Sequence, residues 1–105
     1  MSLQELVVSL MGDIKDPTVR MDIAGTIYYL RDVYLSGSVP AEEIKSALLE
    51  IADTILQMKK PWLTEKERQE EAKKLADQLF NAIKIETMRI RMMRALRRRM
   101  RRGPL

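Results

Sequence analysis

Cysteine and histidine are both absent from this 105-residue chain. Their absence excludes disulfides, thiolate or imidazole catalysis and the usual Cys/His zinc sites. Glycine is also scarce, and its four positions are too scattered to form a phosphate-cradling loop. Carboxylates are plentiful, but their clusters fall at expected helix starts or solvent faces, where they stabilise the helix dipole. We therefore expect no enzymatic activity, no cofactor and no metal site.

Aromatic side chains make up only 5% of the chain. Tyrosines can stack on bases in proteins that bind single strands. Here the three tyrosines fall in one expected helix, over about 17–36, and we expect them in the core rather than at a ligand: Tyr28, Tyr29 and Tyr34. Trp62 follows Pro61 just before the last expected helix, and we expect it to cover one end of the core.

Long hydrophobic runs are missing as well. The longest uncharged apolar stretch in the middle of the chain, Ile23 to Leu30, is far shorter than the roughly 18–20 residues of a membrane span. The N-terminal segment carries acids where a secretory signal would carry bases. The chain has the length of one small domain. We expect an intracellular protein, in the cytoplasm or nucleoid or within a nucleoprotein particle.

The first half of the chain carries the start signals of two helices. Ser2 and Glu5 form a capping-box pattern, and apolar residues then recur every three or four positions as far as Ile14. Asp16 is a good N-cap, and Pro17 suits the first helical position because its missing N–H would have no partner there. These signals predict one helix from about Ser2 and a second from Pro17.

The second helix is expected over about 17–36 and ends where Gly37 can adopt a left-handed conformation. Its few charges suggest that it is the central, most buried helix, with Gly25 allowing close approach of a neighbour. A third helix is expected to open after Pro40 and to end before Pro61.

The fourth helix begins with the capping-box residues Thr64 and Glu67, and no glycine or proline follows until Gly103. It could run nearly 40 residues, much longer than a small bundle requires, so its second half should project or pack on another subunit. The expected fold is all-α: a small bundle of three short helices plus a long, Arg-rich C-terminal helix.

Charge divides the chain into two parts. Residues 1–84 carry 11 basic and 14 acidic side chains, a net charge of −3, whereas residues 85–105 carry eight arginines and one glutamate, a net charge of +7. We therefore divide the chain into a mildly acidic helical body (1–84) and a basic amphipathic tail (85–105). Such asymmetry suggests a polyanion or an anionic surface as the partner.

The tail also separates its residue types by face. Apolar residues in the tail fall on a different helical face from the stripe that would close the bundle, so a straight helix could not turn both to one core. Either a kink near Lys84 to Glu86 or a straight helix with two partners would account for this change of apolar face. The candidate partner surface consists of Ile85, Met88, Met92, Leu96 and Met100, with Ala95 beside it. The candidate nucleic-acid-binding residues are Arg91, Arg94, Arg97, Arg98, Arg101 and Arg102.

Three functions fit this pattern. The first is a non-catalytic nucleic-acid-binding protein that contacts the phosphate backbone of DNA or RNA, as part of a homo-oligomer or larger nucleoprotein assembly. The second is an interaction adaptor or self-assembling subunit whose C-terminal helix docks on a partner. The third is binding to an anionic membrane surface, which is least favoured because the apolar face has no Trp or Phe. A solvated, frayed tail is the simplest alternative to all three.

Overall fold

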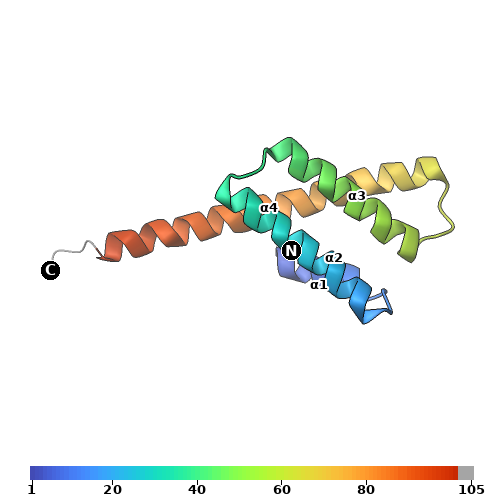
Figure 1. The fold of residues 1–105 in the computed structure, drawn as a ribbon, viewed down its shortest axis with the longest axis horizontal. Coiled ribbons are helices and arrows are strands. Elements are labelled where there is room, and N and C mark those ends of the chain that lie inside the picture. The colour runs from blue at the N-terminus through green and yellow to red at the C-terminus, as the bar shows by residue number, and fades with distance from the viewer. Residues whose placement is uncertain (102–105) are drawn as a thin grey trace.

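The structure is a computed structural model that describes residues 1–101. Within that range the chain consists of α-helices joined by short loops and turns, with no strand, which confirms the expected fold class. Figure 1 shows the arrangement of the four helices: α1 (Leu3–Met11), α2 (Pro17–Ser36), α3 (Ala41–Lys59) and α4 (Glu65–Arg101).

The helix starts follow the signals in the sequence. The Glu5 N–H donates to Ser2 Oγ at 3.1 Å, and the Ser2 N–H donates to a Glu5 carboxylate oxygen at 3.3 Å. The same reciprocal pair opens α4, where the Thr64 N–H donates to Glu67 at 2.9 Å and the Glu67 N–H donates to Thr64 Oγ1 at 3.1 Å. These hydrogen bonds lower the pKa of Glu5 and of Glu67, because they favour the charged carboxylate.

The centre of the core lies between α3 and the first half of α4. Leu48 and Ile55 from α3 meet Leu79 and Ile83 from α4, and all four side chains are fully buried. The second helix contributes only two buried residues, Ile27 and Leu30. The expectation that α2 is the most buried helix is therefore wrong: α4 packs mainly on α3, and nearly half of the α2 residues are exposed.

Three smaller expectations are also wrong. Trp62 is 72% exposed and covers no part of the core, and Tyr29 is 63% exposed, although Tyr28 and Tyr34 do pack against the core. A Cβ atom at Gly25 would meet nothing within 4 Å, so no helix approaches closely there. Tyr29 and Gly25 lie on the exposed side of α2, whereas Trp62 lies in the turn between α3 and α4. Gly37, in contrast, has the expected left-handed conformation, with φ of 73°.

The last helix is one continuous rod of 37 residues, which answers the question of a kink. Its second half extends beyond the other three helices, as Figure 1 shows, and the described chain measures 63 × 28 × 21 Å. Thr87 is the last buried residue of α4, and every residue from Arg91 to Arg101 is exposed. None of the helices among residues 1–101 is long and apolar enough to cross a membrane.

Candidate nucleic-acid interface on the projecting helix

An ion pair ties the start of the projecting segment to α2. The Arg31 guanidinium lies 3.5 Å from one carboxylate oxygen of Glu86, 3.0 Å from Asp32, and over the ring of Tyr28 at 5.0 Å. The other Glu86 oxygen is buried and has no hydrogen-bond partner. Glu86 is the single acidic residue after position 84. Its carboxylate pairs with Arg31 of the body, and among residues 85–101 it forms no salt bridge with an arginine.

Arg91 makes the next contact with the body. Its Nη2 donates a hydrogen bond of 3.1 Å to the backbone oxygen of Leu35. Leu35 lies in the last turn of α2, where backbone carbonyls lack partners within the helix and the helix dipole is negative. A cation is favoured at that place. Arg91 therefore anchors α4 to the end of α2 as well as adding positive charge.

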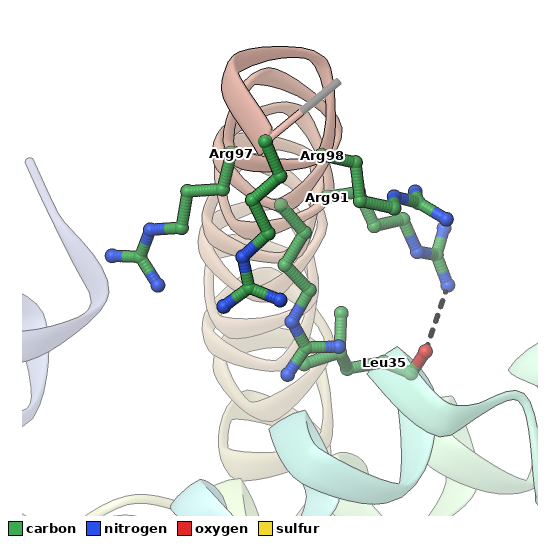
Figure 2. Close-up of a pocket in the computed structure, with 6 residues that line it drawn as sticks. Leu35, Arg91, Arg97 and Arg98 are labelled. Carbon is green, nitrogen blue, oxygen red and sulfur yellow. Dashed lines mark hydrogen bonds between the residues drawn. The ribbon is translucent and has the colours of Figure 1, made fainter. Parts of the chain in front are cut away.

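Beyond Arg91 the arginines and the end of α2 enclose an open hollow of about 510 Å³. Figure 2 shows Arg97 extending to one side of α4 and Arg91 and Arg98 to the other, with Leu35 at the end of α2. Within the described part of the chain, no acidic residue lines the hollow. Among residues 1–101, Arg91 is alone among these arginines in bonding to another side chain or backbone group. The lining residues are Leu35, Arg91, Arg94, Arg97, Arg98 and Arg101.

The helical repeat explains why the arginines face the body side of α4. Eighteen residues make five complete turns of an α-helix, so residues 18 apart point in the same direction. Four arginines of the hollow stand in this relation to buried residues: Arg94, Arg97, Arg98 and Arg101 follow Ala76, Leu79, Phe80 and Ile83. The arginine face is thus the continuation of the core face past the edge of the bundle, and this is why α2 can end beside it.

The structure brings together five of the six arginines expected to bind nucleic acid. Arg102 lies outside the described residues. Arg89 and Arg99 are exposed but lie away from the hollow. Sequence analysis missed the Leu35 carbonyl and the contact between Arg31 and Glu86. No local pattern marks those groups, because they come from helices about 55 residues apart in the chain.

The expected partner surface lies on the opposite side of α4 from the hollow. All five of its side chains are between 49% and 80% exposed, and Met93 at its edge is 47% exposed. The projecting segment therefore has one cationic face and one mainly apolar face, on which Arg89 and Arg99 also lie. The residues of the apolar face are Ile85, Met88, Met92, Leu96 and Met100.

No protein-family model, curated protein or solved structure matches this chain. What the chain binds must therefore be inferred from its own residues and their geometry.

Proposed function

We propose that this is a non-catalytic nucleic-acid-binding protein that contacts the phosphate backbone through the arginines of α4. The observation that carries the proposal is the hollow at the end of α2, where five guanidinium groups gather without a carboxylate among the lining residues. Arginine remains charged at any physiological pH, and its planar fork binds phosphate through two hydrogen bonds. A bound polyanion would relieve the repulsion among these five cations.

The length of the cationic face favours a polymer over a small anion. From Arg91 to Arg101 the helix rises about 15 Å, and a B-DNA strand carries about four phosphates over that distance. The face is also open to solvent along this length. A single phosphate would engage one or two of the arginines, whereas a nucleic-acid strand would engage most of them together.

The same geometry argues against reading of base sequence. Among the described residues no aromatic side chain lines the hollow, so none is placed there to stack on bases. The described lining also has no Asn or Gln to recognise adenine edges, and arginine, which can contact guanine, is its one base-reading side chain. The contacts would go to phosphates, which fix position and supply affinity but carry no sequence information. We expect binding to DNA and RNA that depends weakly on sequence and strongly on salt.

The test compares two variants with equal changes in net charge. One replaces Arg94, Arg97, Arg98 and Arg101 with Gln. The control replaces four exposed lysines of the body with Gln: Lys15, Lys66, Lys73 and Lys74. Fluorescence anisotropy with labelled duplex DNA, single-stranded DNA and RNA over a salt series gives the affinity and its salt dependence. Circular dichroism confirms that each variant folds, since exposed substitutions usually change stability by within about 0.5 kcal/mol each.

For duplex DNA the slope of log affinity against log salt should be near −4 for the unaltered chain, corresponding to about four or five neutralised phosphates. The Arg variant should lose most of that slope and bind at least about 100-fold more weakly near physiological salt, because each lost contact removes about 0.9 from the slope. The lysine variant should stay close to the unaltered chain. Equal losses in both variants would contradict the proposal, as would binding to anionic vesicles but to no nucleic acid.

A further inference from the structure

The apolar face of the projecting segment has no partner in the described chain. We call it the Met stripe; its residues are Ile85, Met88, Met92, Leu96 and Met100, with Met93 at the edge. From Ile85 to Met100 it runs about 22 Å along the helix. Arg89 and Arg99 lie on the same side of the helix as these residues. Single exposed apolar side chains are ordinary on protein surfaces, but six along one side of a projecting helix are typical of an interaction surface.

We propose that the Met stripe is a dimer interface, against which the Met stripe of a second copy packs in antiparallel orientation. A stripe on one face of a helix is complementary to itself, because a two-fold axis near its middle brings the same side chains together from both copies. Methionine suits such a contact, since its flexible thioether adapts to an irregular surface. Met92 lies near the centre of the stripe and would lie near the axis.

The area is sufficient for a stable dimer. Burying an apolar side chain of this size removes roughly 100 Å² from water, so six side chains remove roughly 600 Å² from each copy. The two copies together would bury roughly 1,200 Å², at the lower end of the range for specific protein interfaces. Because the helical repeat places the stripe on the side of α4 opposite the face that continues the core, a second helix can lie along it without meeting the body of the first copy.

Charge favours the antiparallel orientation over the parallel one. Residues 85–101 carry seven arginines and one glutamate, so a parallel pair would hold two strongly basic segments side by side in register. An antiparallel pair with its axis near Met92 instead places residues 97–101 of each copy, which carry four arginines, beside residues 83–87 of the other copy, where one lysine and one glutamate balance each other. In both copies the arginine face would point outward, on the side opposite the Met stripe, and stay free for a polyanion.

Cysteine cross-linking tests the orientation without interference, because the chain has no cysteine of its own. Near the axis, two copies of Met92→Cys would face each other and should form a disulfide-linked dimer under mild oxidation. Two copies of Met100→Cys would lie about 24 Å apart along the pair, beyond the roughly 7 Å limit between the Cα atoms of a disulfide. Met21→Cys, exposed on α2, controls for collision. Equal cross-linking at all three positions would overturn the proposal.

Sedimentation equilibrium at about 100 μM protein tests the dimer itself. The unaltered chain should approach twice its 12.2 kDa mass. The variant Met88→Gln, Met92→Gln, Leu96→Gln should be monomeric, whereas the control Val8→Gln, Met21→Gln, Met58→Gln, which alters three exposed apolar residues elsewhere, should dimerise. Raising NaCl from about 0.15 to about 0.5 M should not weaken the dimer, because salt screens the repulsion between tails.

A monomeric unaltered chain at both salt concentrations would overturn the dimer, and so would an unchanged dimer in the Met88, Met92 and Leu96 variant. Neither result bears on nucleic-acid binding. The four-arginine variant described above should still dimerise, because its substitutions lie on the other face of α4. The two proposals therefore succeed or fail separately.

Discussion

The contact between Arg31 and Glu86 should respond asymmetrically to removal of its two charges. Arg31→Gln would leave the Glu86 carboxylate half-buried, at 28% exposure, with one oxygen already lacking a partner and no cation beside the other. It would also remove the guanidinium from the Tyr28 ring, a contact worth about 0.5–1 kcal/mol. With an unpaired and partly desolvated carboxylate added, we expect a loss of about 2 kcal/mol in the free energy of unfolding.

Glu86→Gln should cost much less. The ion pair is long, at 3.5 Å, and both side chains are partly exposed, so its loss should cost at most about 1 kcal/mol. Replacing the carboxylate with an amide also removes a charge from a partly buried position, which offsets part of that loss. We expect a net change within about 0.5 kcal/mol. The double variant should then lose about 1 kcal/mol less of the free energy of unfolding than the sum of the two single losses, because the two residues interact.

These three variants form a double-mutant cycle. Urea unfolding followed by circular dichroism at 25 °C gives the free energy of unfolding of each variant, and from these the coupling energy between Arg31 and Glu86. The reasoning requires the Arg31 substitution to be the more damaging one and requires a coupling energy between the two sites. If Glu86→Gln destabilises the fold as much as Arg31→Gln, or if the two effects simply add, then Glu86 is not held by Arg31 and the start of the projecting segment is fixed by apolar packing alone.

Two further predictions concern the body. Gly25→Ala should stabilise the fold by about 0.5–1 kcal/mol, because the site is helical and open. Gly37→Ala should destabilise it by about 1–2 kcal/mol, because alanine disfavours a φ of 73°. Urea unfolding of both variants checks this, and changes of the same sign in the free energy of unfolding would contradict it. The hydrogen bond from Arg68, at 2.7 Å, lowers the pKa of Asp53, so its contribution is present above the carboxyl's ordinary value of 3.8 and is lost as the pH falls below it. Asp53→Asn should therefore be less stable than the unaltered chain at neutral pH, by up to about 1 kcal/mol because the pair is partly exposed. The difference in the free energy of unfolding should disappear in acid. A difference independent of pH in urea titrations would contradict this.

Much of the fold follows from local signals. Asp16 with Pro17, Gly37 and the Thr64 capping box set the helix ends close to where they are observed, because caps and turns depend on a few neighbouring residues. Burial was harder to predict. Trp62 and Tyr29 are large and mostly apolar, yet both are exposed, because burial depends on which distant segments of the chain pack beside a residue.

In the candidate site, too, some features follow from local sequence and others depend on packing between helices. By itself the sequence determined that most arginines of the tail lie opposite its methionines on one long helix, with Arg89 and Arg99 as exceptions, since helical periodicity follows from residue spacing alone. It also determined the separation of charge between body and tail. Only the tertiary structure decided that α4 continues unbroken beyond α2, that Arg91 binds the Leu35 carbonyl, and that the arginines enclose a hollow there. Those features depend on where α2 ends relative to α4, and packing between helices distant in the chain sets that relation.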